Sequence, residues 1–127
     1  TKIPVFGMQE SGFLTAMARG DRIGVVAISE GSILRHRKYL RRIGVLDRMV
    51  AERPLNMSVA HTASGKDTFE RLEAVSNTLV QQDSADVIVL GCAGLSVYRS
   101  RLETILDCPV VDPTQSAVAM ALGAVLA

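Results

Sequence analysis

Short apolar runs alternate with amphipathic stretches along the chain. The runs are rich in β-branched residues and are continuous rather than alternating, which is typical of strands buried on both faces of a sheet. They cover residues 3–6, 23–28, 57–61, 87–90 and 109–111. We therefore expect five strands in a mostly parallel sheet.

Helical patterns fill the segments between these strands. They cover residues 9–19, 32–43, 65–82, 97–106 and a final stretch from residue 112. Ser32 is placed to cap the second helix, and Ser64 with Asp67 forms a capping-box pattern at the third. Asp112 followed by Pro113 is a typical helix start. The alternation predicts an α/β fold: an open, mostly parallel sheet with helices on both faces, in a single domain of residues 1–127.

The two ends of the chain resemble each other. Residues 3–18 read IPVFGMQESGFLTAMA and residues 108–123 read CPVVDPTQSAVAMALG, so that Pro4 aligns with Pro109. Any two junctions between a strand and a helix share some likeness, but a true repeat implies a protein of two similar lobes. The chain does not begin with Met, and the same offset puts the counterpart of Cys92 upstream of it. We therefore expect one lobe of a pseudo-symmetric two-lobe protein.

Composition narrows the choice of partners. The 14 basic and 13 acidic residues leave a net charge of +1, which gives no reason to expect a nucleic acid. No apolar run reaches the ~18–20 residues of a membrane span, so we expect no membrane contact. The chain is 48% hydrophobic, which indicates apolar surface for a missing first lobe or a second copy. Its two cysteines are too few for a disulfide framework and suit the reducing cytoplasm.

The stretch that points to chemistry is Gly-Cys-Ala-Gly, directly after a predicted strand. Open parallel sheets bind ligands beyond the carboxyl ends of their strands, where we expect Cys92. Gly91 and Gly94 would let a ligand approach the backbone. The amides of Ala93, Gly94 and Leu95 lead into a helix, which favours an anion and a thiolate. The alternative is a small buried cysteine at a tight turn; a dinucleotide site is disfavoured because the G-x-G-x-x-G register is absent.

These residues belong to a longer pattern. The sequence ADVIVLGCAGLSVYRSRLETILDCPVVDPTQSAVAMA, residues 85–121, resembles the C-terminal segment of the aspartate/glutamate/hydantoin racemase superfamily. Upstream, IPVFGMQESG and GDRIGVVAISEGSILRHRKYLRRIGV resemble the start of that family's second lobe, so the resemblance covers essentially the whole chain. It implies two pseudo-symmetric α/β lobes with a small-molecule substrate between them. In that arrangement we expect the final helix, residues 112–127, to pack on the first lobe.

The resemblance also implies a mechanism without a cofactor, and we expect no metal site. In this family each lobe contributes one cysteine, and the two cysteines lie on opposite faces of an acidic α-carbon. One removes a proton and the other returns one. Cys92 matches the second-lobe cysteine, whereas the first-lobe cysteine has no match in this chain. The amides of Gly91, Ala93 and Gly94 would hold the substrate's carboxylate or imide oxygen. The predicted activity is a cofactor-independent racemase of amino-acid-like or hydantoin-like substrates.

Two alternatives stay open. Some relatives, the arylmalonate-type decarboxylases, keep only the second-lobe cysteine as a proton donor, and they cannot be separated from racemases without the first lobe. A chain complete in itself would instead suggest a small-molecule-binding module without catalysis. Neither the exact substrate nor the oligomeric state follows from the sequence.

Two polar residues are further candidates for substrate binding. Ser29 lies in a loop between a strand and a helix, where a carboxylate can bind. Many relatives carry a hydroxyl residue directly after this strand, but Ala27 and Ile28 stand there in this chain. Glu10 begins a helix that borders the interlobe cleft in the family, and helix capping is its alternative role.

The remaining chemically versatile residues have structural interpretations. We expect Cys108 to be structural, and the reducing context argues against a disulfide with Cys92. We interpret His61 as a loop histidine, although it could act as an acid or base at the ligand face. His36 lies in a basic run, residues 35–42, which is typical of a solvated helix face.

Overall fold

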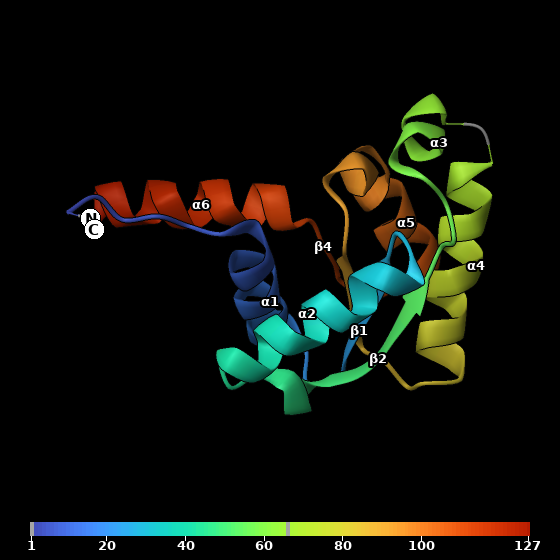
Figure 1. Ribbon diagram of the computed structural model, residues 1–127, viewed down its shortest axis with the longest axis horizontal. Helices are drawn as coiled ribbons and strands as arrows, with labels where there is room; N and C mark the ends of the chain where they lie inside the picture. The colour runs from blue at the N-terminus through green and yellow to red at the C-terminus, as the bar shows by residue number, and fades with distance from the viewer. Residues whose placement is uncertain (1, 66) are drawn as a thin grey trace.

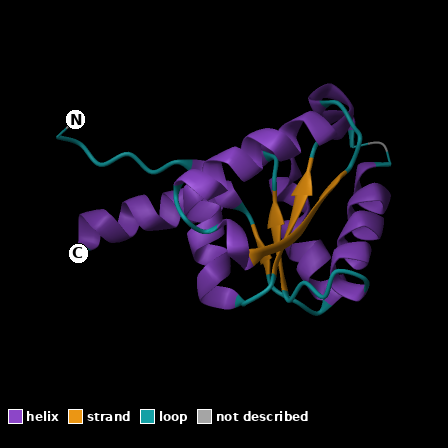
Figure 2. Ribbon diagram, turned by 60° about the horizontal axis from the view of Figure 1, so that its bottom comes forward, coloured by secondary structure: helices purple, strands orange, loops and turns teal. Residues whose placement is uncertain are grey.

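Four parallel strands form the centre of the computed structural model, which describes residues 2–65 and 67–127. Their order across the sheet is β2-β1-β3-β4 (Figure 2). The strands are β1 (Ile23–Ala27), β2 (Met49–Pro54), β3 (Val87–Leu90) and β4 (Val110–Val111). The predicted α/β class and parallel sheet are thereby confirmed.

Helices cover both faces of this sheet (Figures 1 and 2). They are α1 (Met8–Arg19), α2 (Glu30–Arg42), α3 (Val59–Ser64), α4 (Thr68–Gln81), α5 (Arg99–Leu106) and α6 (Pro113–Leu126), with short 3-10 helices η1 (Leu46–Arg48) and η2 (Ala93–Tyr98). Helices α1 and α2 pack on one face, and α4 and α5 pack on the other.

The apolar core has two parts because successive residues of a strand point to opposite faces. On β3, Val87 and Val89 contact the cluster under α1 and α2, whereas Ile88 and Leu90 contact the cluster under α4 and α5. All four side chains are buried. Burial on both faces explains why the strand is apolar at every position rather than at every second one.

One predicted strand, residues 3–6, is wrong. This segment belongs to no strand, and Ile3 and Val5 are 77% and 82% exposed. Its backbone extends from the body of the molecule, away from the sheet (Figures 1 and 2). An apolar run alone therefore did not create a strand where no sheet edge lay beside it.

The predicted strand at residues 57–61 is also wrong, because the true strand comes earlier. Ser58 caps α3 by accepting a hydrogen bond from the amide of His61 at 3.0 Å, so the run becomes a short helix. The strand that pairs with β1 on the side away from β3 is β2, whose polar residues Glu52 and Arg53 interrupt the apolar pattern. Because of these two polar side chains, the segment did not match the continuous apolar pattern expected of a buried strand.

Helix starts were predicted with mixed success. Asp112 caps α6 as expected, accepting hydrogen bonds from the amides of Thr114 and Gln115. The second helix begins one turn earlier than predicted, with Ser29 rather than Ser32 at its N-cap. The capping box at the third helix is wrong: Ser64 ends α3, and Asp67 stands at the N-cap of α4 without a side-chain capping bond.

The first and last helices are neighbours. Gly12 on α1 faces Pro113 on α6 so closely that a side-chain carbon at Gly12 would lie 2.9 Å from the proline ring. Ser11 and Ser116, which the sequence repeat would equate, are both buried. Both ends of the chain leave the molecule on the same side (Figures 1 and 2).

Helix α6 projects from the body of the molecule (Figure 1). Its exposed apolar side chains are Val118, Leu122, Val125 and Leu126. In the part of the chain that the structure describes, α6 and the other helices are all too short or too polar to cross a membrane.

Candidate functional site

The carboxyl ends of β1 and β3 mark the place where the sheet changes direction. From β1 the chain crosses to β2 on one side, and β3 lies on the other side. In open parallel sheets, such a switch point forms a crevice that binds ligands. Ser29 follows β1, and Gly91 and Cys92 follow β3, so all three lie at this edge.

Gly91 is required by the packing of the two strands. Its amide donates a 2.7 Å hydrogen bond to the carbonyl oxygen of Val26 on β1. A side-chain carbon at Gly91 would collide with the same oxygen. Strand packing therefore requires this glycine whether or not a ligand approaches it, and the Gly91 amide, which we expected to hold the substrate, already has an acceptor.

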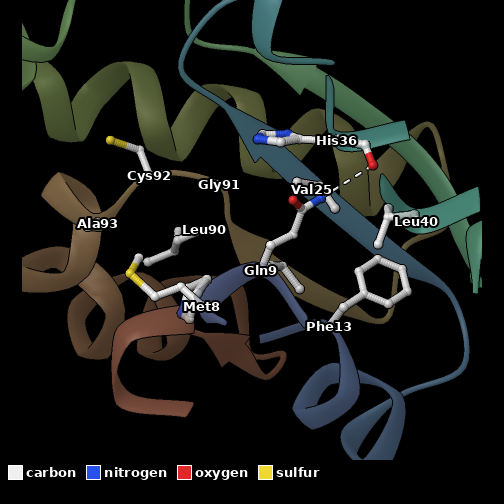
Figure 3. A pocket seen from close by; sticks show the side chains of 12 residues that line it. Met8, Gln9, Phe13, Val25, His36, Leu40, Leu90, Gly91, Cys92 and Ala93 are labelled. Carbon is white, nitrogen blue, oxygen red and sulfur yellow. Dashed lines mark hydrogen bonds between the residues drawn. The ribbon is translucent and has the colours of Figure 1, made fainter. Parts of the chain in front are cut away.

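Cys92 lies at the edge of the sheet with its thiol only partly covered. Its extended backbone (φ −145°, ψ 133°) continues the alternation of β3, so its side chain lies on the same face as Leu90. In Figure 3, Sγ points away from Gln9 and Phe13 towards the outside of the turn. The residue is neither sealed in the core nor fully exposed. Cys92 is therefore a half-buried residue at the edge of the sheet where ligands bind in this type of fold.

The turn after Cys92 offers two unused donors. The Leu95 amide, which we had expected to face a ligand, donates to the Cys92 carbonyl at 3.0 Å. Ala93 and Gly94 are exposed, and their amides have no acceptor among residues 2–65 and 67–127. A side-chain carbon at Gly94 would meet Cys92 Sγ only at 3.7 Å, so packing does not require this glycine.

Asp112 stabilises the turn that follows Cys92. The residue is 2% exposed, and its carboxylate accepts a 2.9 Å hydrogen bond from the Ser96 hydroxyl of η2 while it caps α6. One buried acid thus joins the segment after Cys92 to the last helix. Sequence reasoning identified the cap but missed this second contact.

A cavity of about 80 Å³ lies beside the turn, between α1, α2 and the sheet (Figure 3). It is smaller than the ~150 Å³ that holds a benzene molecule, so it fits part of a small ligand. Its wall is mostly apolar, with Phe13 and Leu40 among the lining side chains. The polar side chains at its wall belong to Gln9 and His36, and Cys92 borders it next to Gly91 with its thiol turned away from Gln9 and Phe13.

His36 is not on a solvated face, and that interpretation of the basic run is wrong. Its side chain is 19% exposed, and Nδ1 contacts Oε2 of Glu52, whose side chain is 1% exposed. Its carbonyl accepts a 3.3 Å hydrogen bond from the Gln9 side chain, drawn as a dashed line in Figure 3. The signal that could have revealed the pair was an acid within the otherwise apolar start of β2.

The other candidates lie around this site rather than in the cavity. The Ser29 hydroxyl is 3.2 Å from that of Ser32, and Ser29 does not line the cavity. Glu10 is exposed and accepts a 2.9 Å hydrogen bond from the Tyr39 hydroxyl, which raises the pKa of Tyr39. Gln9, next to Glu10, lines the cavity instead.

Cys108 lies at the opposite edge of the sheet from Cys92. Given the pairing of Ile88 with Val110, the two cysteines are six residue steps apart along the strands, or about 20 Å. Disulfide geometry requires Cα atoms within about 7 Å, so the two cannot be bridged. Burial and nearby carboxylates raise the pKa of the Cys108 thiol, which keeps it protonated. Within the described ranges, three His, Cys, Asp or Glu side chains nowhere come together as a metal site.

Comparison with known proteins gives a consistent result. Residues 1–121 match the sequence profile of the Asp/Glu/Hydantoin racemase family. The hydantoin racemase of Paenarthrobacter aurescens is 30% identical over 126 residues, covering 95% of this chain and 52% of that protein. The hydantoin racemase of Pseudomonas sp. (strain NS671) is 28% identical over 122 residues, with 95% and 49% covered.

Solved structures agree on the fold. The allantoin racemase from Pseudomonas fluorescens has a TM-score of 0.93 at 25% identity, with 98% of this chain and 54% of that chain covered. The allantoin racemase from Klebsiella pneumoniae also has a TM-score of 0.93, at 24% identity, with 97% and 51% covered. The chain therefore spans about half the length of the proteins it matches.

Proposed function

Because the chain belongs to the Asp/Glu/hydantoin racemase family, we propose that its protein inverts an acidic α-carbon of a hydantoin-like or amino-acid-like substrate. The support is the family match together with relatives named hydantoin racemase and allantoin racemase. A hydantoin ring carbon beside a carbonyl is acidic, because the negative charge left by proton loss is delocalised onto the carbonyl oxygen.

The observation that carries the proposal is the position of Cys92. A partly exposed thiol stands at the switch point of the sheet, beside two backbone amides without acceptors in the described structure. Cys92 exchanges a proton with one face of the α-carbon as a thiolate base or a thiol acid. Inversion needs a second group on the opposite face, which we assign to the other half of the protein.

Backbone and hydroxyl groups bind the substrate in this proposal. The amides of Ala93 and Gly94 donate to the carboxylate or imide oxygen, where charge builds up as the proton leaves. Gly91 holds the turn against β1, and Ser29 approaches the substrate from the end of that strand. Glu10 stays a prediction as a residue of the cleft rim.

The remaining proposals concern the whole protein. The reaction needs no metal or organic cofactor, because two thiols and a carbonyl suffice for proton exchange. The apolar face of α6 packs on the other half of the protein. A cytoplasmic location would keep both thiols reduced.

The test is isotope exchange with one enantiomer of 5-methylhydantoin or allantoin in deuterated water. Deuterium should enter the α-position while optical activity is lost, and Cys92→Ser should abolish enzyme-dependent exchange. The matched control is Cys108→Ser, because that thiol lies at the other edge of the sheet. Exchange in Cys92→Ser at the parent rate would refute the role of Cys92.

Two further assays on the same protein, arylmalonate cleavage and ligand binding, separate the two alternatives. Release of carbon dioxide from an arylmalonate, without racemisation of either hydantoin, would indicate a decarboxylase. Binding of these compounds without exchange or cleavage would indicate a non-catalytic module.

A further inference from the structure

His36 and Glu52 form a pair at the cavity that takes no part in the proton transfer proposed for Cys92. Glu52 lies on β2 opposite Val25 of β1, and Val25 lines the cavity. His36 reaches Glu52 from α2 and itself lines the cavity. The pair therefore stands between the edge of the sheet and the same cavity that Cys92 borders.

Burial makes this pair costly unless it is satisfied. The Glu52 side chain is 1% exposed, and among the described residues its Oε1 has no hydrogen-bond partner. A buried carboxylate loses its hydration and needs a partner in return. His36 is the partner of Oε2, so the buried Glu52 carboxyl group beneath α2 orients the imidazole ring of His36.

The bond to Glu52 also determines which imidazole nitrogen is available. Nδ1 of His36 is engaged with Oε2 of Glu52, so Nε2 is the nitrogen left over for a ligand. In the view of Figure 3 the ring extends from α2 in the direction of Gly91 and Cys92. The Gln9 side chain, another polar group of the wall, donates to the His36 carbonyl at 3.3 Å.

We propose that His36, oriented by Glu52, binds a polar group of the substrate through Nε2 in the cavity beside Cys92. This inference rests on the proposed function, since it takes the substrate to be the one that Cys92 deprotonates. Glu52 is a positioning residue: it touches His36 and not the substrate. The contact holds the substrate equally in the ground state and in the transition state, so it acts on KM rather than on kcat.

The test uses the full-length protein and substitutions that each keep a polar group near the place of only one of the two imidazole nitrogens. His36→Asn keeps an N–H near the place of Nδ1 for Glu52 but removes Nε2, whereas His36→Gln restores a polar group near the place of Nε2. For allantoin or 5-methylhydantoin, His36→Asn should raise KM about tenfold with kcat within twofold. His36→Gln should recover part of that loss, and Glu52→Gln should raise KM about threefold. Arg37→Gln, exposed on the same helix, is the matched control and should change neither constant.

A purely structural role gives a different pattern. His36→Asn would then lower the melting temperature and leave KM at the parent value, which would overturn the inference. Calorimetric binding of the same two probes to the parent and to His36→Asn, repeated with Cys92→Ser added to both, separates this inference from the proposed function. If the parent catalyses no exchange but His36→Asn still weakens probe binding about tenfold, the function fails and the inference stands. If probe affinity is unchanged, or neither probe binds the parent, the inference fails.

Discussion

The two cysteines of this chain lie at opposite edges of one sheet and have different polar groups around them. Cys92 follows β3 at its carboxyl end, and Cys108 precedes β4 at its amino end. Both are partly buried, so exposure alone does not separate them. Amides without acceptors in the described structure follow Cys92, whereas the carboxylates of Glu103, Asp86 and Asp107 act on Cys108.

This difference follows from the direction of the strands. At the carboxyl edge of a parallel sheet the chain turns into the N-termini of helices, which present N–H donors. At the amino edge it arrives from helix C-termini, which present carbonyl groups. The Cys108 thiol donates to a backbone carbonyl, that of Pro109, at 3.8 Å. The carboxyl edge of the sheet therefore surrounds a thiol with donors, and the amino edge surrounds it with acceptors.

The largest effect should come from the glycine that holds Cys92 in place. Gly91→Ala places a carbon against the Val26 carbonyl and should destabilise the protein by about 3 kcal/mol, since backbone cannot move aside as a side chain can. Gly94→Ala, with ordinary contacts, should change stability by less than about 0.5 kcal/mol. Urea denaturation of both variants measures the difference. Equal stabilities would show that β1 and β3 do not approach each other so closely.

A smaller effect separates the two thiols directly. At pH 7.5, iodoacetamide should modify Cys92 about tenfold faster than Cys108, because burial and nearby carboxylates raise the pKa of Cys108 and leave little thiolate. Raising the pH should speed up the labelling of Cys108, as its thiol ionises. Peptide mass spectrometry follows both sites in one sample. Faster labelling of Cys108 at neutral pH would reverse the comparison.

The smallest effect concerns Glu103, which lies beside Cys108. A hydrogen bond from the Val110 amide, together with Arg99 and Arg19, lowers the pKa of the Glu103 carboxyl. A lowered folded-state pKa contributes stability above the unfolded value of about 4.3, and this is lost as the pH falls through the folded value. Glu103→Gln should therefore cost about 1 kcal/mol at pH 7.

Two measurements on this variant check the argument. The stability difference from the parent should shrink as the pH falls below about 4, and Cys108 should be alkylated somewhat faster because one carboxylate charge is gone. A stability difference that grows in acid would contradict the assigned direction.

The sequence was sufficient to predict the elements with uniform patterns. Strands β1 and β3 are buried on both faces, so their apolar runs were unambiguous. Strand β2 was missed because Glu52 and Arg53 carry its polar contacts, and those partners, His36 and Asp83, lie far away in the sequence. Local pattern cannot reveal a charge that is satisfied by a distant residue.

The site was predictable to a similar degree. The general rule for parallel sheets placed Cys92 at the carboxyl edge, and the structure has it there. The reason for Gly91 was missed because its contact with Val26 joins two strands that are distant in the sequence. His36 was misinterpreted because its charged neighbours on α2 are exposed while it is not.

The close contact between Gly12 and Pro113 fixes how near the first helix can come to the last. A side-chain carbon at Gly12 would lie 2.9 Å from the proline ring, so only a residue without a side chain fits at this crossing. The helix that starts directly after Asp112 is thus held by α1 as well as by its own cap.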